Sequence, residues 1–280
     1  MEPLDFDETG HVIETANYSM HYHEAGEGPT FILLHGSGPG VSGWSNFKGN
    51  FPVFAERFRT IIVDMPGFGM SSMPQFSKAY PQHAADAVLE LMDALAIERA
   101  SLLGNSMGGF VATELAVAAP ERVERLVMMG PGGLFVPITS PERSEGGKAL
   151  QGFLVDPTRE NMVAWVDTMV ANTAVVSDEL IDERLTNALK PGVLEATMQI
   201  FGSIGQFPRD VPLFALAHTI QAPTLITWGR DDRMLPLDGA LLAARRMPNV
   251  ELHTFSNCGH WAQVERKHEF ERLVIEFLTR

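Results

Sequence analysis

Short, continuous apolar runs alternate with helical periodicities along most of this 280-residue chain. Runs such as 31–34 and 60–63 lie between turn residues and show no polar alternation, as is typical of strands buried on both faces. Repeated strand–helix units predict an α/β fold with a mostly parallel central sheet flanked by helices. The expected strands are 18–24 (at a sheet edge), 31–34, 60–63, 101–103, 126–129, 224–227 and 250–255, and the expected helices are 82–95, 110–119 and 264–278.

The alternation breaks between Pro131 and Pro212. A loop pattern at 137–147 is followed by helical patterns at 160–170, 178–189 and 193–204, without any strand pattern. An all-helical insertion between two strands of a parallel sheet predicts a cap over the strand ends, where ligands often bind. The expected organisation is a core in two parts, 1–133 and 213–280, with an inserted helical cap at 134–212. Large apolar residues of this region either line a roomy pocket or form the cap's own core: Phe135, Phe153, Met162, Trp165, Met169, Met198 and Phe201.

Composition excludes several classes of partner. The formal net charge is −14 and no basic cluster is present, which argues against a nucleic-acid partner. The single cysteine, Cys258, permits no intrachain disulfide and fits a reducing compartment. The acidic N-terminus lacks the pattern of a signal peptide, and no apolar stretch approaches the ~20 residues that span a bilayer. We expect a soluble, cytoplasmic protein with no membrane partner.

A G-x-S-x-G motif follows one predicted strand and precedes a predicted helix. In the sequence Gly104-Asn-Ser-Met-Gly-Gly109, small residues at 104 and 108 permit a strained turn that raises the Ser106 hydroxyl above the sheet. The helix that follows offers backbone N–H groups and the positive end of its dipole. Ser106 is therefore the candidate nucleophile. The alternative is a small-residue turn that only packs a helix against a strand.

A second glycine-rich loop, His35-Gly-Ser-Gly-Pro-Gly40, follows the strand at 31–34. It lacks the Lys-Ser/Thr ending and the G-x-G-x-x-G spacing of phosphate loops. Strand, G-x-S-x-G turn and helix resemble the α/β-hydrolases, in which this loop and the residue after the nucleophile supply the oxyanion-hole N–H groups. The resemblance implies Ser37 and Met107 as donors, and we expect His35 to shape the loop.

An acid and a base follow later strands. Gly229-Arg-Asp-Asp-Arg233 comes after the strand at 224–227, and His260 comes after the last strand. The order serine, aspartate, histidine is that of the α/β-hydrolases, with His260 as the group that takes the Ser106 proton. Spacing alone leaves the choice between Asp231 and Asp232 open. No spacing suggests a metal site, so neither a metal ion nor a cofactor is expected.

The combined motifs resemble one branch of that superfamily, the meta-cleavage product hydrolases, which break carbon–carbon bonds. The resemblance covers nearly the whole chain and is weakest in the cap. Its motifs are HGSGPG (35–40), GWSN (43–46), GNSMGG (104–109), MGPGG (129–133), WGRDDR (228–233) and CGHWAQ (258–263).

This resemblance implies a substrate and a set of site residues. The substrate is a 2-hydroxy-6-oxohexa-2,4-dienoate with a variable 6-substituent, and the acid of the triad is Asp232. Arg184 lies in the cap, and its alternative interpretation is a surface arginine on an amphipathic helix. A homodimer is the assembly that the family suggests. The residues expected at the dienoate are Gly36, Gly38, Asn46, Asn105, Arg184 and Trp261.

Two other functions remain open from the sequence. A carboxylesterase or other acyl hydrolase uses the same triad, but it does not need Arg184, Asn46 and Trp261. A non-catalytic ligand-binding protein can share the fold, since fold alone does not define function.

Overall fold

A computed structural model of the chain describes residues 3–73, 75–134 and 144–280. Its strands are β1 (Gly10–Glu14), β2 (Ser19–Ala25), β3 (Thr30–Leu34), β4 (Arg59–Val63), β5 (Ala100–Asn105), β6 (Val123–Met129), β7 (Thr224–Gly229) and β8 (Val250–Phe255). They form one sheet in the order β1-β2-β4-β3-β5-β6-β7-β8. The β1–β2 and β2–β4 pairs are antiparallel, and all pairs from β4 to β8 are parallel.

All seven predicted strands are present, but the prediction that residues 18–24 form an edge strand is wrong. β2 pairs with β4 on one side and with β1 on the other, so β1 is the edge. No residue of β1 is fully buried, and Val12 is 59% exposed. A strand this exposed carries little of the apolar pattern by which the other strands are recognised.

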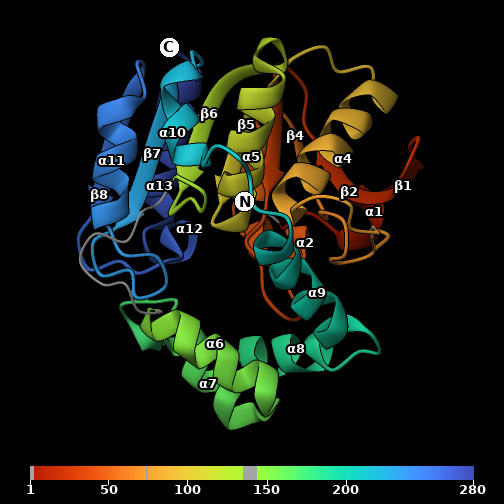
Figure 1. Cartoon of the computed structure of the whole chain (residues 1–280), viewed down its shortest axis with the longest axis vertical. Coiled ribbons are helices and arrows are strands. Elements are labelled where there is room, and N and C mark those ends of the chain that lie inside the picture. Colours follow the sequence, from red (N-terminus) through yellow and green to blue (C-terminus); the bar gives the residue numbers. More distant parts are fainter. Residues whose placement is uncertain (1–2, 74, 135–143) are drawn as a thin grey trace.

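Helices cover both faces of the sheet (Figure 1). Side chains of α4, α5 and α11 pack with one face of the sheet, and those of α2, α3 and α13 pack with the other. The helices of the core are α1 (Phe6–Thr9), α2 (Gly43–Phe47), α3 (Phe51–Ala55), α4 (Tyr80–Ala94), α5 (Met107–Ala118), η1 (Pro120–Arg122), α10 (Leu213–Leu216), η3 (Ala217–Thr219), α11 (Asp238–Arg246), α12 (Ala262–Glu265) and α13 (Lys267–Leu278). The single helix expected at 264–278 is therefore divided at Arg266, and α11 adds a helix that the sequence patterns did not predict.

Four helices between β6 and β7 lie together apart from the sheet, in the lower part of Figure 1. They are α6 (Glu145–Val155), α7 (Arg159–Asp167), α8 (Asp178–Ala188) and α9 (Val193–Gln206), with the short η2 (Thr173–Val175) between α7 and α8. The loop expected at 137–147 ends earlier than predicted, because α6 begins at Glu145. Residues 137–143 of that expectation, and Phe135, lie outside the described residues.

Most of the large apolar residues of this region form its own core. Phe153, Met162 and Trp165 are fully buried in one cluster with residues of α6, α7 and α8. Met198 is instead half exposed. The helical insertion thus has a compact interior of its own. Within the described ranges, none of the helices is long and apolar enough to cross a membrane.

The end of α7 is bonded to the core through main-chain groups. Arg233 donates to the carbonyls of Asp167 and Val170, the latter over 3.1 Å. Glu265 accepts from the N–H groups of Ala171 and Asn172 at 2.8 and 3.0 Å. On the α8 side, the ion pair between Lys48 and Glu183 is half exposed, with 3.3 Å between nitrogen and oxygen.

Candidate active site

Ser106 stands between β5 and α5 in a conformation that L-residues rarely adopt, with φ 53° and ψ −111°. Two main-chain bonds fix it there. Its N–H donates to the Met129 carbonyl at 3.0 Å, and its carbonyl accepts from Gly132 N at 2.9 Å. The turn therefore has the strained strand-to-helix geometry that the G-x-S-x-G motif predicts.

Close backbone contacts explain the glycines of this turn. A Cβ on Gly108 would lie 2.0 Å from the Leu34 carbonyl oxygen, at the end of β3. A Cβ on Gly104 would lie 2.4 Å from the carbonyl oxygen of Gly108. Real Cβ atoms essentially never approach other atoms this closely. Only glycine at both positions lets α5 pack against β3 and β5 with Ser106 between them.

The loops after β7 and β8 bring a histidine and an aspartate together. His260 Nδ1 and Asp232 Oδ2 are 2.7 Å apart, and both side chains are buried. The other carboxylate oxygen, Oδ1, accepts from Met234 N at 2.8 Å and Leu235 N at 2.9 Å. These bonds leave the carboxylate one orientation. Asp231, the alternative by spacing, instead pairs with Arg230 at the surface.

The backbone of the histidine loop is bonded to the segment that follows α7 in the helical insertion. His260 N donates to the Met169 carbonyl at 2.7 Å, and Trp261 N donates to the same oxygen at 3.2 Å. Glu265 accepts from Gly259 N at 2.6 Å with the oxygen that does not bind the cap. The position of His260 therefore depends on the segment that follows α7.

A small cavity brings together residues from α2, α7 and α8, from the segment after α7, and from the loops at the ends of β3, β5, β7 and β8. Its volume is about 10 Å³, barely the space of one water molecule. The predicted site residues that line the cavity are Gly36, Ser37, Asn46, Asn105, Ser106, Arg184, His260 and Trp261, and the others are Val41, Trp165, Met169 and Met234.

Three predicted residues do not line this cavity. Asp232 is bonded to His260 Nδ1, which leaves Nε2 as the nitrogen able to act on a substrate. Met107 is the first residue of α5 and is buried in the core cluster. Gly38 packs against Trp165, and a Cβ there would lie 2.3 Å from the ring. Any contribution of Met107 and Gly38 to binding must come from their backbone.

His35 holds the loop after β3 in place. Its Nδ1 lies 2.6 Å from the Gly36 carbonyl oxygen, and its Nε2 accepts from Met65 N at 3.0 Å. These partners require the proton on Nδ1. Burial lowers the pKa of His35 below its usual value, with Asp64 opposing the effect, so the ring is neutral at pH 7. The prediction that His35 shapes this loop agrees with its contacts.

The Arg184 guanidinium lies within cation–π distance of two indole rings. Its Cζ lies 4.9 Å from the ring centre of Trp261 and 5.4 Å from that of Trp165. The guanidinium forms no hydrogen bond or ion pair with any residue that the structure describes. Burial lowers the pKa of Arg184 to about 10, against the effect of Glu183, so the cation persists at pH 7. Among the described residues, this cation has no acidic partner within ion-pair distance.

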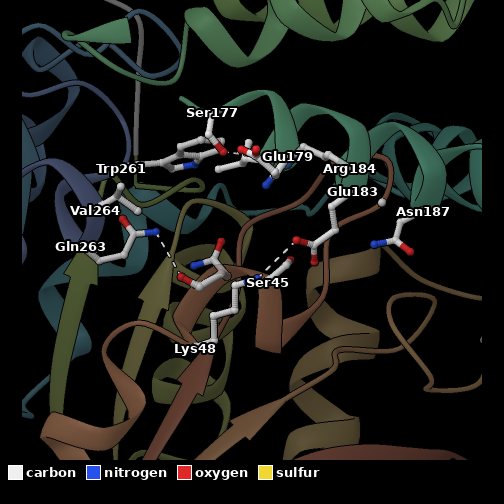
Figure 2. Close-up of a pocket in the computed structure, with 13 residues that line it drawn as sticks. Ser45, Lys48, Ser177, Glu179, Glu183, Arg184, Asn187, Trp261, Gln263 and Val264 are labelled. Atoms are coloured by element: carbon white, nitrogen blue, oxygen red, sulfur yellow. Dashed lines mark hydrogen bonds and ion pairs between the residues drawn. The ribbon is translucent and has the colours of Figure 1, made fainter. Parts of the chain in front are cut away.

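Arg184, Asn46 and Trp261 also line a larger neighbouring cavity of about 310 Å³ between α2 and α8 (Figure 2). Two buried amides next to it have an unused polar atom within the described part of the chain. These atoms are Asn46 Nδ2 and Gln263 Oε1. Among the described residues, no group of three or more His, Cys, Asp or Glu side chains is placed to hold a metal ion.

Comparison with known proteins gives the family. The family model for the alpha/beta hydrolase fold matches residues 29–267. A 2-hydroxy-6-oxononadienedioate/2-hydroxy-6-oxononatrienedioate hydrolase from Pseudomonas sp is 41% identical, over 94% of this chain and 93% of that relative. A 2-hydroxy-6-oxo-6-phenylhexa-2,4-dienoate hydrolase from Burkholderia cepacia is 38% identical, over 94% of this chain and 92% of that relative.

The chain belongs to the meta-cleavage product hydrolases of the α/β-hydrolase fold. The solved structure of the meta-cleavage product hydrolase CumD from Pseudomonas fluorescens IP01 matches this hydrolase with a TM-score of 0.85 and 33% identity. The match covers 97% of this chain and 98% of CumD. The family and the fold that the motifs suggested are thereby confirmed.

Four residues at the cavity of this hydrolase were not assigned to the site from the sequence. The sequence left open whether Trp165 and Met169 line the pocket or belong to the interior of the helical insertion. In the structure they do both. No motif or periodicity in the sequence pointed to Val41 or Met234 as site residues. Met234 stands two residues after Asp232, the predicted acid, so its place on that loop was the one available indication.

Proposed function

We propose that this hydrolase cleaves the C5–C6 bond of 2-hydroxy-6-oxohexa-2,4-dienoates, the ring-fission products of catechols. The products are a carboxylic acid and a 2-hydroxypenta-2,4-dienoate. Arg184 is the observation that carries the proposal, because it brings to the cavity lined by Ser106 and His260 a cation with no ion-pair partner among the described residues. A substrate that carries a carboxylate several atoms from its reactive carbonyl fits this arrangement.

The reaction begins with a proton transfer. Cleavage expels a carbon, which requires an electron sink, so the dienol must first become the 2-ketone. His260 assists this transfer, since Asp232 orients its ring and stabilises its charged form. Arg184, Asn46 and Asn105 hold the substrate carboxylate and 2-oxo group through charge-assisted hydrogen bonds.

The C6 carbonyl then lies against the N–H groups of Ser37 and Met107, next to Ser106. Oxyanion-hole donors of this kind are worth about 3–4 kcal/mol each. Ser106, or a water that it activates, adds to C6. C5 has received its proton during the change of the dienol to the ketone, so the C5–C6 bond breaks with its electrons passing into the conjugated 2-ketone. The resulting C2 enolate oxygen takes up a proton, which gives the 2-hydroxypenta-2,4-dienoate. On the covalent route, water then hydrolyses the acyl group from Ser106 and releases the carboxylic acid. A burst of product in the first turnover separates the covalent route from the activated-water route.

The direct test uses the yellow ring-fission product of 2,3-dihydroxybiphenyl. Wild-type protein is expected to bleach the visible absorbance as benzoate forms, and Ser106→Ala is expected to lose this activity by at least about a thousandfold. The alternative is a carboxylesterase with the same triad. Absence of bleaching with phenyl, alkyl and steroid-sized substrates, together with fast hydrolysis of p-nitrophenyl esters, would establish that alternative.

Three further proposals accompany this function. The chain divides into a core (1–133 and 213–280) and an inserted cap (134–212), it assembles as a homodimer, and it acts in the cytoplasm on a small-molecule dienoate. Light scattering after size-exclusion chromatography measures the assembly. Limited proteolysis tests the division, since cleavage at the two cap boundaries is expected before cleavage inside the core.

A further inference from the structure

Trp165 links the cap, Arg184 and the loop after β3. It is a fully buried residue of α7. Its ring packs on Gly38 so closely that no larger residue fits there, and Arg184 Cζ lies 5.4 Å from the ring centre. Neither the motifs nor the proposed mechanism gives Trp165 a role.

Two indole rings lie close to the Arg184 guanidinium. The side chain is long and flexible, and its head has no hydrogen-bond or ion-pair partner in the described part of the chain. Its Cζ lies 4.9 Å from the ring centre of Trp261 and 5.4 Å from that of Trp165. A cation between desolvated indole rings is stabilised by their electrostatic quadrupoles. In Figure 2, Arg184 and Trp261 lie at the same side of the larger cavity.

Holding a cation with rings differs from holding it with an acid. A carboxylate partner would occupy the N–H groups and compete with the substrate. Ring contacts stabilise the charge and leave the planar fork of N–H donors unused. The arrangement therefore preorganises an anion site without filling it.

We propose that Trp165 is a positioning residue, which fixes the Arg184 guanidinium so that it can receive the substrate carboxylate. The inference rests on the role of Arg184 under the proposed function. Trp165 acts through its ring face, and its Nε1, which has no partner among the described residues, is not required. Loss of the ring is expected to weaken carboxylate binding about tenfold.

The test uses sorbate, the hexa-2,4-dienoate anion, as a probe of carboxylate binding by titration calorimetry. Trp165→Leu and Arg184→Leu are each expected to raise the Kd of sorbate about tenfold, and the double variant should bind no more weakly than Arg184→Leu alone. Trp165→Phe keeps a ring face and is expected to stay within about threefold of wild type. With the ring-fission product, Trp165→Leu should raise KM about tenfold and change kcat by less than about threefold.

Phe153→Leu is the matched control. Phe153 is fully buried in the same cap cluster and stacks on Trp165 with ring centres 6.3 Å apart, and it lines neither cavity. The Phe153→Leu variant should bind sorbate with the Kd of wild type. An equal loss in Phe153→Leu would show that loosening of the cap core is responsible, and an equal loss in Trp165→Phe would assign the effect to Nε1. Either result overturns the proposal, as does wild-type sorbate affinity in Trp165→Leu or no sorbate binding by wild type.

Failure of the proposed function gives a different result. Wild-type protein that binds sorbate with the expected variant pattern, but bleaches no ring-fission product, would contradict carbon–carbon hydrolysis and still support the positioning of Arg184 by Trp165. Thermal unfolding of each variant, compared with wild type, checks that the variants are folded.

Discussion

The loops that carry the proposed catalytic residues and the helix that carries Arg184 are held by different forces. Ser106, Asp232 and His260 stand on loops after strands, and each is fixed by hydrogen bonds to main-chain groups. Arg184 stands on a cap helix, and two ring faces restrain it without any hydrogen bond to the described residues.

The difference matches two chemical tasks. Bond breaking requires reacting atoms at fixed distances, which main-chain bonds at a sheet edge provide. Recognition of a carboxylate requires donors that remain unpaired until the substrate arrives, which ring contacts permit. We expect substitutions in the core to affect folding and kcat, and substitutions in the cap to affect KM.

The largest expected effect compares two glycines. Gly108→Ala places a Cβ 2.0 Å from the Leu34 carbonyl, so we expect loss of activity and destabilisation by at least about 3 kcal/mol. Gly202→Ala, in cap helix α9, meets nothing within 4 Å and should raise stability by about 0.5–1 kcal/mol. Thermal unfolding measures both. Equal effects at the two sites would contradict the contrast between a tightly packed core and a tolerant cap.

Mild acid is expected to act on the core, since residues 134–212, the proposed cap, contain no histidine. Burial lowers the pKa of His23 to about 4, helped by His21 and His11 and opposed by Asp64. The unfolded chain takes up this proton near pH 6.5, before the folded protein does. The contribution of His23 to the free energy of unfolding is therefore fully present above pH 6.5. It declines as the pH falls towards 4.

The expected loss from His23 is about 2 kcal/mol between about pH 7.5 and about pH 5. Urea unfolding at the two pH values measures it. His23→Phe keeps a ring beside Phe6 and Trp44, and it should show the smaller change. If His23→Phe loses as much stability as wild type between the two pH values, His23 is not the cause of the loss.

A third prediction concerns the hydrogen bonds by which Glu265 joins the histidine loop to the segment after α7. Glu265→Ala removes the acceptor of Gly259, Ala171 and Asn172 N–H groups, and these hold the histidine loop against the cap. We expect kcat to fall about tenfold, with a smaller change in KM, because His260 loses alignment. Glu269→Ala is the control, since its exposed carboxylate pairs with Arg266. A rise in KM alone would place Glu265 in substrate recognition instead.

The smallest effect is expected at the half-exposed ion pair between Lys48 and Glu183. Lys48→Ala breaks the ion pair with Glu183, whose partners are both about half exposed. Surface pairs contribute little, so kcat/KM should change by less than about twofold. Steady-state kinetics at low and high salt checks this. A larger, salt-dependent change would give this pair a part in substrate entry.

The contrast between the core and the cap also explains which parts of the structure could be predicted from the sequence. Buried strands such as 31–34 and 60–63 show continuous apolar runs, and the loops that follow them carry local motifs, so the sheet, Ser106 and His260 could be located without a structure. β1 could not, because its residues are largely exposed. Asp231 and Asp232 were equivalent by spacing, and the main-chain bonds from Met234 and Leu235 determine which one faces His260.

The cap residues were harder to assign, since their roles depend on tertiary contacts. A helical pattern predicts that Trp165 is buried, but it does not indicate that its ring meets Arg184 from another helix. The bonds of Glu265 join segments more than ninety residues apart. Long-range pairs of this kind leave no local periodicity.

The main-chain bond from His260 to Met169 has a consequence for chimaeric enzymes. An exchange of caps between family members would alter substrate preference only if the base stays aligned, and Met169 of the cap supplies the carbonyl that His260 N requires. The segment 167–172 and the core residues that bind it, Arg233 and Glu265, form one unit across the boundary. A transplanted cap needs this unit to match on both sides, so the useful crossover points lie beyond it and not at the ends of the cap helices.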